Sequence, residues 1–347
     1  MEKVREVKIG NVRIGGKNPI RIKGMLKSRL SEKLLINEAK RLEKEGAEIV
    51  RVAFVEESNE KIIKKLKKVL KIPLVADIHF NPKLAFKAIE SGVDGIRLNP
   101  LNISSKKDVK GIIKEARERE ISIRVGINSG GFRKKFKDAR SLAYEMLKVV
   151  RNYLRIFEEQ NFFDIIVSLK AESVYATVLA NKMFREEFDY PLHIGVTATG
   201  PFIDGIIKSS LGIGILLHGG IGEVLRVSLL APSWQEVRVA KAIVQFLEKR
   251  KFFPEIIACP TCSRCQVDLK SIVNRFQKRL EGKKVPFSKI ALMGCVVNGP
   301  GEAIQADIGI AFAKKKGVIF KEGKILKTIS EENAEEEFLT FFENVIS

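Results

Sequence analysis

A short apolar, β-rich run followed by a longer amphipathic stretch recurs along residues 20–230 of this chain. The apolar runs predict strands at Ile20–Met25, Glu48–Phe54, Pro73–Ile78, Gly95–Leu98, Ser122–Ile127, Asp164–Leu169, Leu192–Thr197 and Val224–Leu229. Apolar positions at helical spacing predict helices at Ser31–Glu45, Asn59–Leu70, Lys106–Arg119, Asp138–Glu159, Ala171–Phe188 and Ser233–Lys249. Alternating units of this kind indicate an α/β protein whose N-terminal domain is a (β/α)8 TIM-type barrel. The alternative is an open doubly wound sheet, but the first βα turn lacks its Gly-x-Gly-x-x-Gly pattern.

The pattern changes after Lys249-Arg250-Lys251, whose positive charges suit the C-terminus of a helix. Pro254 follows, so we place a boundary near residue 252, between a substrate-binding barrel (1–252) and a small α/β domain (253–347). In the second domain we expect helices at Ser271–Glu281 and Asn333–Val345, and strands at Lys289–Met293, Asp307–Phe312 and Val318–Lys321. The segment Lys314–Gly317 predicts a hairpin turn.

Composition narrows the class of protein. No apolar run reaches the roughly 18 residues of a membrane span, and the first residues lack the apolar core of a signal peptide, so we expect a cytoplasmic protein. The formal net charge of +20 is mostly explained by lysine-rich outer faces of helices. The remaining charge would suit an anionic substrate or an acidic partner protein. Nucleic acid is disfavoured because the charge is spread along the chain and no nucleic-acid motif is present.

Basic side chains occur inside or at the ends of five predicted strands, where a charge is costly unless it is paired. They are Arg51, Arg97, Arg124, Lys170 and Arg226, accompanied by the polar residues Asn99, Asn128, Ser168, Thr197 and Ser228. Strand ends share one face of a barrel, so this set predicts a pocket for an anion with several phosphate oxygens. Asp77 and His79 form a candidate acid/base pair, although His79 is alternatively a loop residue satisfied by its neighbour. His193 is either an interior residue or a ligand contact.

All four cysteines of the chain lie in two C-terminal stretches, as Cys259, Cys262, Cys265 and Cys295. Such clustering indicates a metal centre. A zinc ribbon normally has two Cys-x-x-Cys pairs, and the second stretch offers one cysteine, so an iron–sulfur cluster is favoured over zinc. Spacing alone leaves open whether four thiolates bind the cluster or whether three do so with Glu302 as an oxygen ligand.

Taken together, these segments resemble one family, 4-hydroxy-3-methylbut-2-en-1-yl diphosphate synthase of the methylerythritol phosphate route to isoprenoids, in its bacterial two-domain form. The resemblance extends along nearly the whole chain. It is carried by residues 75–80 (VADIHF), 96–100 (IRLNP), 225–229 (LRVSL), 258–264 (ACPTCSR) and 294–302 (GCVVNGPGE). The last two segments are its most specific part.

The resemblance implies an oxidoreductase that opens the ring of 2-C-methyl-D-erythritol 2,4-cyclodiphosphate with two electrons and loss of water, giving 4-hydroxy-3-methylbut-2-enyl diphosphate. It implies a [4Fe-4S] cluster held by Cys259, Cys262, Cys295 and Glu302, with Cys265 outside the ligand set. Reduced ferredoxin or flavodoxin would supply the electrons. The implied catalytic residues are Glu302, Asp77 and His79, and the implied substrate contacts are Arg51, Arg97, Asn99, Arg124, Asn128, Lys170, Arg226 and Ser228. It further implies a head-to-tail homodimer in which one subunit's cluster domain covers the other's barrel mouth.

Three loops depart from the family pattern. Residues 23–28 read KGMLKS, where the family typically has Gln-Ser-Met-Thr-Asn-Thr. Ala198 and Gly219 stand where the family has glutamates. These differences leave open an alternative, a divergent paralogue that reduces another phosphorylated substrate.

Overall fold

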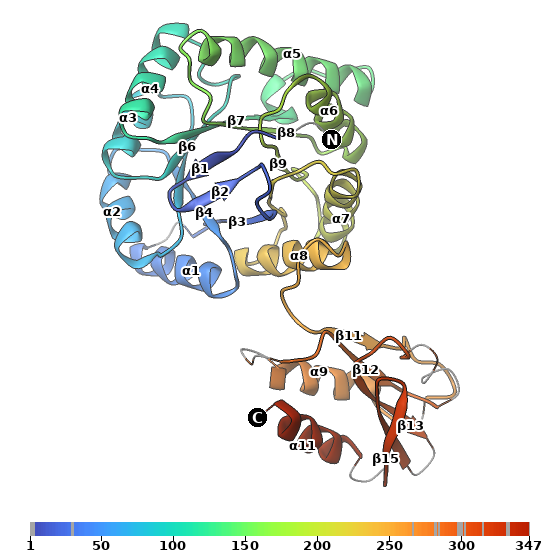
Figure 1. Cartoon of the computed structure of the whole chain (residues 1–347). Helices are drawn as coiled ribbons and strands as arrows, with labels where there is room; N and C mark the ends of the chain where they lie inside the picture. Colours follow the sequence, from blue (N-terminus) through green and yellow to red (C-terminus); the bar gives the residue numbers. More distant parts are fainter. Residues whose placement is uncertain are drawn as a thin grey trace. The chain divides into compact units, whose positions relative to one another are not determined.

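The computed structural model describes residues 4–28, 31–265, 267–280, 283, 285–296, 301, 303–313, 316–330 and 334–346. The chain divides into two compact units, Met1–Arg250 and Lys251–Ser347 (Figure 1). Within the described ranges, no helix is both long enough and apolar enough to cross a membrane.

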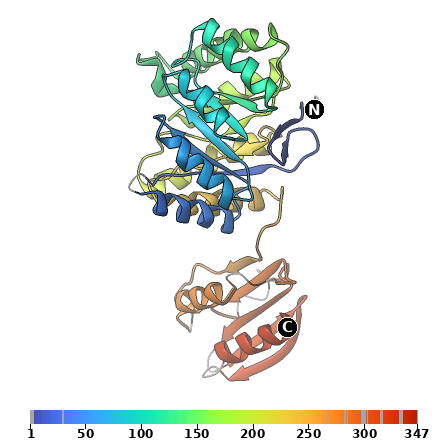
Figure 2. The same cartoon turned by 90° about the vertical axis from the view of Figure 1, so that its left-hand side faces the viewer.

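Parallel strands surrounded by helices form the first unit (Figures 1 and 2). The sheet order is β8-β7-β6-β5-β4-β3-β10-β9, and a parallel bridge between Val167 and Leu192 joins its two ends. The predicted TIM-type barrel is therefore confirmed. Its strands are β3 (Arg21–Met25), β4 (Ile49–Phe54), β5 (Leu74–Ile78), β6 (Gly95–Leu98), β7 (Ser122–Asn128), β8 (Ile165–Lys170), β9 (His193–Ile194) and β10 (Val224–Leu225).

The barrel helices present an apolar face to the sheet. They are α1 (Glu32–Lys44), α2 (Asn59–Val69), α3 (Lys83–Glu90), α4 (Lys106–Glu118), α5 (Ala139–Glu158), α6 (Val174–Glu187), α7 (Phe202–His218) and α8 (Ser233–Phe246), with a 3-10 turn η1 (Ser129–Phe132) before α5. Side chains of Ser31, Ser105, Asp138 and Ser173 accept hydrogen bonds from the first turns of their helices. The predicted helices are confirmed. The sequence reasoning did not identify α3, which is short, or α7, which has few charges.

Two barrel strands are much shorter than predicted. The runs Leu192–Thr197 and Val224–Leu229 contribute only two-residue strands, β9 and β10. Gly195 has φ of +152°, and a Cβ atom there would lie 2.4 Å from the carbonyl oxygen of Arg226. This close backbone approach ends regular pairing after Ile194.

An N-terminal hairpin, β1 (Val7–Ile9) and β2 (Val12–Ile14), covers one end of the barrel. Its apolar side chains pack against Ile49, Val75, Ile166 and Val224, which lie at the starts of their strands. The hairpin therefore closes the N-terminal end, and ligands must enter from the C-terminal end.

The second unit is a five-stranded sheet in the order β11-β12-β13-β14-β15, parallel across the first three strands and antiparallel beyond. Its elements are β11 (Glu255–Ala258), α9 (Leu269–Leu280), β12 (Lys289–Met293), β13 (Ile308–Ala313), β14 (Lys316–Lys321), β15 (Lys324–Ser330) and α11 (Ala334–Ile346). Ala313 pairs with Lys316, so Lys316 and Gly317 belong to β14 and not to the predicted turn. The other two residues of that turn, 314 and 315, lie outside the described residues.

Candidate functional site

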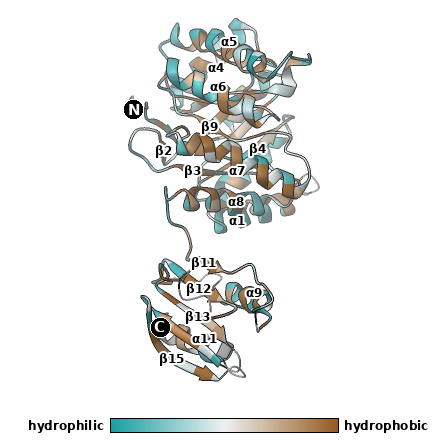
Figure 3. Ribbon diagram, turned by 90° about the vertical axis from the view of Figure 1, so that its right-hand side faces the viewer, coloured by the Kyte–Doolittle hydropathy of each residue, from teal (hydrophilic) through white to brown (hydrophobic). Residues whose placement is uncertain are grey.

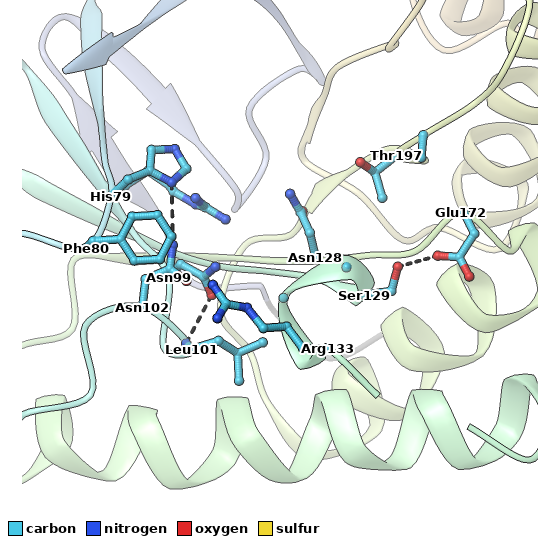
Figure 4. A pocket seen from close by; sticks show the side chains of 14 residues that line it. His79, Phe80, Asn99, Leu101, Asn102, Asn128, Ser129, Arg133, Glu172 and Thr197 are labelled. Carbon is cyan, nitrogen blue, oxygen red and sulfur yellow. Dashed lines mark hydrogen bonds between the residues drawn. The ribbon is translucent and has the colours of Figure 1, made fainter. Parts of the chain in front are cut away.

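A cavity of about 900 Å³ opens beyond the C-terminal ends of the barrel strands (Figure 4). Its wall includes four of the predicted site residues, His79, Arg97, Asn99 and Asn128. Asn99 Oδ1 accepts a hydrogen bond of 3.1 Å from the backbone N–H of Leu101. The wall thus carries several polar side chains and lies where a barrel binds its ligand.

Asp77 lies below this cavity and holds three predicted site residues together. Its Oδ2 is 3.4 Å from Arg51 Nη1 and 3.6 Å from His79 Nε2, and its Oδ1 is 3.3 Å from Arg97 Nη1. Burial opposes ionisation of this carboxyl group, but Arg51, the His79 hydrogen bond and Arg97 hold its pKa well below the usual range. Asp77 is therefore a carboxylate that fixes two arginines. Burial lowers the pKa of Arg51 to about 10, so Arg51 stays charged at neutral pH.

Arg124 is buried and has the fewest partners of the barrel arginines. Its Nη1 donates to Ser168 Oγ at 3.0 Å, whereas its buried Nε and Nη2 have no partner among the described residues. The buried Nε atoms of Arg97 and Arg226 also lack acceptors there. Gly126 makes this crowding feasible, because a Cβ atom at that position would lie 2.7 Å from Ser168 Oγ and 3.0 Å from Arg97 Nε. Unsatisfied buried donors of this kind indicate an absent acceptor, such as phosphate oxygens.

Lys170 and His193 form a second buried pair. Lys170 Nζ lies 3.3 Å from His193 Nε2, and His193 Nδ1 has no partner among the described residues. Burial, followed by the charges of Arg124 and Arg226, lowers the pKa of Lys170 well below its ordinary value. Burial and Lys170 do the same for His193. His193 is thus an interior residue. Together with Arg51, Arg97, Arg124, Lys170 and Arg226 it forms a group that we call the basic cluster.

Arg226 is oriented by a carboxylate that the sequence reasoning did not single out. Arg226 Nη2 donates to both carboxylate oxygens of Glu236 on α8, at 3.2 and 3.1 Å, and the side chain of Glu236 is 1% exposed. Lys27 Nζ lies 2.8 Å from the same carboxylate. The partly exposed Ser228 is the predicted contact with the weakest link to this cluster: its carbonyl oxygen accepts a bond from Thr199, and it does not line the cavity.

The two positions where this sequence lacks a family glutamate lie in different parts of the barrel. Ala198 lines the cavity, and its φ of +50° is in the left-handed region. Gly219 is the exposed residue that follows α7. Of the two positions where the sequence lacks a glutamate, one therefore faces the candidate ligand site.

The cysteines lie beyond the ends of two adjacent parallel strands, β11 and β12. The Gly294 N–H lies 3.4 Å from Cys259 Sγ, and a Cβ atom at Gly294 would lie only 2.4 Å from Cys265 Sγ. Cys265 Sγ donates to the carbonyl oxygen of Val267 at 3.2 Å, and Cys262 is exposed. Cys259 and Cys265 lie beside Gly294, which has no side chain, and the cysteines offer the thiolate donors that an iron–sulfur group requires.

The ligand set cannot be completed from this geometry. No three His, Cys, Asp or Glu side chains gather as a metal site within the described part of the chain. Glu302 and residues 297–300 of the Gly-Pro-Gly segment lie outside it.

Known proteins match both units. The GcpE TIM-barrel domain matches residues 4–241, and the GcpE protein C-terminal domain matches residues 255–344. A protein of Thermodesulfovibrio yellowstonii is 46% identical over 94% of this chain and 94% of its own length. A protein of Caldanaerobacter subterraneus is 44% identical over 99% of this chain and 97% of its own length. Both are named 4-hydroxy-3-methylbut-2-en-1-yl diphosphate synthase (flavodoxin).

Solved structures with related folds include dihydropteroate synthase of Xanthomonas albilineans, with a TM-score of 0.52 and 13% identity over 69% of this chain and 98% of that chain. N-acetylneuraminic acid synthetase of Leptospira borgpetersenii gives a TM-score of 0.51 and 13% identity over 81% of this chain and 99% of that chain. At these identities the likeness concerns the fold alone. The two matched domains and the near full-length relatives show more, namely that this chain belongs to the 4-hydroxy-3-methylbut-2-en-1-yl diphosphate synthase (GcpE) family.

Proposed function

We propose that the chain catalyses the two-electron reductive ring opening and dehydration of 2-C-methyl-D-erythritol 2,4-cyclodiphosphate to 4-hydroxy-3-methylbut-2-enyl diphosphate. The observation that carries this proposal is the set of buried arginine N–H groups beneath the cavity that have no acceptor among the described residues. A diphosphate offers several acceptor oxygens to such donors, and one guanidinium group can donate two parallel hydrogen bonds to two of these oxygens.

The barrel residues would bind and orient the diphosphate. Arg124, Arg97 and Arg226 direct free N–H groups into the basic cluster, while Asp77 and Glu236 hold the latter two in place. Arg51, Lys170, Asn99, Asn128 and Ser228 are the remaining proposed contacts. Because the arginines are already fixed by carboxylates and strands, little reorganisation is needed when the anion arrives.

His79 and Asp77 are the proposed proton-handling pair. The His79 ring has Asp77 Oδ2 3.6 Å from Nε2 and the Asn102 amide 3.5 Å from Nδ1 (Figure 4). These two neighbours fix the orientation of a ring that lies on the cavity wall. A histidine placed in this way can donate or accept a proton at the ligand.

The proposed cofactor is a [4Fe-4S] cluster held by Cys259, Cys262, Cys295 and Glu302. Once bound, such a cluster supplies single electrons and a Lewis-acidic iron. The chain's own contribution would be the cysteines after β11 and β12 and the space left by Gly294. The proposed electron donor is flavodoxin or ferredoxin. Support comes from the flavodoxin in the relatives' names and from the charge of +20, which favours an acidic partner.

A homodimer is proposed as the working form. Support comes from α7, which is largely hydrophobic in Figure 3. Its exposed residues Ile203, Ile207, Leu211 and Ile215 recur every four residues and so share one face. Contiguous exposed apolar surface of this kind is typical of contact surfaces. If one subunit's cluster domain serves the other's barrel, mixing an Arg124→Met chain with a Cys295→Ser chain should restore activity. No restoration in verified mixed dimers would place each site within one chain. The cytoplasmic location stays a prediction.

The function is tested by anaerobic assay of the cluster-replete protein with the cyclodiphosphate and reduced flavodoxin or dithionite. We expect the linear diphosphate product from the native protein and from an Arg140→Met control, since Arg140 is exposed on α5. We expect Arg124→Met to raise KM by at least about tenfold, because it removes charge-assisted hydrogen bonds. A cluster-replete native sample that gives no product would refute the proposal.

A second candidate is a paralogue that reduces another phosphorylated compound, which one observation favours. Ala198 replaces an expected glutamate at a position that faces the cavity. If this alternative holds, Ala198→Glu should raise turnover of the cyclodiphosphate. A native protein already as fast as its relatives would exclude the alternative.

A further inference from the structure

Lys23 is a buried cation to which none of the proposed steps assigns a role. It lies on β3 and is 3% exposed. In the parallel pairing of β3 with β4, Met25 lies beside Arg51, and side chains alternate along a strand, so Lys23 and Met25 face the barrel interior with Arg51. No hydrogen bond or ion pair joins its ammonium group to any residue of the described ranges.

The neighbours of Lys23 are mainly cations from every side of the barrel. The charged and titratable groups that act on it are Arg51, Asp77, Arg124, Lys170, His193 and Arg226. The carboxylate of Asp77 is already engaged by two arginines. An ammonium group held here without a partner is costly, so its presence requires a compensating charge.

Lys23 and Arg124 lie on opposite walls of the barrel. In the sheet order, β3 and β7 are four strands apart in a ring of eight. Even so, Arg124 is the charge that acts most strongly on Lys23. Both side chains are buried on strands of opposite walls, and two buried N–H groups of Arg124 have no acceptor among the described residues.

We propose that Lys23 is a further ligand for the anion that binds in this barrel, opposite Arg124, and that it takes up a proton when the anion binds. This inference rests on the proposed function only in that the ligand is a diphosphate. An anion between the two walls would satisfy both side chains at once. It would also make Lys23 a positioning residue particular to this chain, since the family typically has glutamine at this place.

The electrostatics of the barrel interior support the proton uptake. Burial, then the charges of Arg124 and Arg51, lowers the pKa of Lys23 well below its ordinary value, and an anion beside the ammonium group would raise this pKa again. A cyclic diphosphate has one ionisable oxygen on each phosphorus atom, and both are ionised at neutral pH. Protons taken up during binding must therefore enter the protein, at Lys23 and at the similarly affected Lys170 and His193.

The lowered pKa also fixes the sign of the stability change. Because the pKa of Lys23 is lower in the folded chain than in the unfolded chain, unliganded stability rises with pH between the lowered value and about pH 10.4. Lys23→Met keeps the length of the side chain and removes the charge. It should therefore raise the unliganded melting temperature near neutral pH and make the rise with pH shallower. A lysine that merely supports the fold would give a lower melting temperature.

The test is anaerobic calorimetric titration of the cluster-replete protein with the cyclodiphosphate, in two buffers of different ionisation enthalpy at one pH. We expect Lys23→Met to weaken binding by about 10- to 100-fold, the loss for one charge-assisted hydrogen bond, and to lower the number of protons taken up. Lys8→Met, a strand lysine exposed on β1, should change neither quantity. Lys23→Arg should keep most of the affinity.

Unchanged affinity and unchanged proton uptake in Lys23→Met, with native turnover intact, would overturn the inference and leave the proposed function standing. A variant that is destabilised or fails to fold would also contradict it, because the inference requires stabilisation. If the native protein does not bind the cyclodiphosphate, the proposed function fails and inorganic pyrophosphate becomes the probe. In that case, weaker pyrophosphate binding by Lys23→Met would support the inference, and equal binding would refute it.

Discussion

Replacing Asp77 by asparagine isolates the charge that holds the basic cluster together. Asparagine has the shape of aspartate, so the change creates no cavity and acts through electrostatics. In the native protein, Asp77 lies within 3.3 to 3.6 Å of Arg97, Arg51 and His79. The variant would leave the two arginines facing Arg124 with no carboxylate between them.

The expected cost follows from burial. Removing one partner of a buried ion pair typically costs about 3–5 kcal/mol, because the other charge remains desolvated and unpaired. In a unit the size of this barrel, each kcal/mol lowers the melting temperature by about 2–4 °C. We therefore expect a fall of about 6–20 °C in the barrel transition, measured by calorimetry on the full chain.

The pH dependence of this loss has a definite sign. The pKa of Asp77 is lowered in the folded protein, so its stabilisation is fully present above about pH 4 and is lost as the pH falls through the lowered value. The difference between native protein and variant should stay constant from about pH 6 to pH 8 and shrink only below about pH 4. Pyrophosphate should raise the melting temperature more in the variant, because the anion replaces the missing charge.

The control is Asp138→Asn at the exposed N-cap of α5, where asparagine caps as well as aspartate. We expect its melting temperature to stay within about 2 °C of the native value. If the melting temperature of Asp77→Asn also stayed within about 2 °C of the native value, the reasoning would be refuted. That result would mean that solvent or another group already compensates the charges of both arginines.

Further predictions concern the cluster, a glycine and the helix stripe. Cys265→Ser should keep four irons per chain after anaerobic reconstitution and Cys259→Ser should lose them; the reverse result would assign Cys265 to the ligand set. Gly126→Ala should raise KM by about tenfold or more by displacing basic side chains, whereas Gly214→Ala on α7, with open space around it, should not. Ile207→Glu should convert a dimer into a monomer by light scattering, and a dimer that persists would exclude the α7 stripe as the interface.

Most of the barrel was predictable because its strands are nearly continuous apolar runs between amphipathic helices. The family, the fold and the enzyme class inferred from the sequence are confirmed by the domain matches and the relatives. The errors have local causes. The shortening of β9 follows from the backbone of Gly195, whose contact with a neighbouring loop no periodicity reveals. β11 and β15 were not predicted as strands, because their sequences carry weak alternation.

The sequence predicted an anion site from the basic residues at strand ends, and this role stays a prediction. The structure places most of these residues in the cavity wall or in the buried cluster below it. Which charge is paired could not be read from the sequence. Glu236 neutralises Arg226 only because the first turn of α8 packs beside the barrel mouth. Lys23, by contrast, carried a usable signal, since strand alternation places it on the same face as Met25.

The distribution of these pairs indicates how the barrel balances stability against binding. Asp77 on β5 compensates the charges of Arg51 on β4 and Arg97 on β6, the two neighbouring strands. Glu236 compensates the charge of Arg226. This side of the basic cluster is therefore stable without a ligand. Arg124, Lys170 and Lys23 have no such carboxylate among the described residues. Burial and the neighbouring cations lower the pKa of both lysines and of Arg124. An anion bound beside these three groups would favour their charged forms and so raise all three pKa values, which couples anion binding to the stability of this side of the basic cluster.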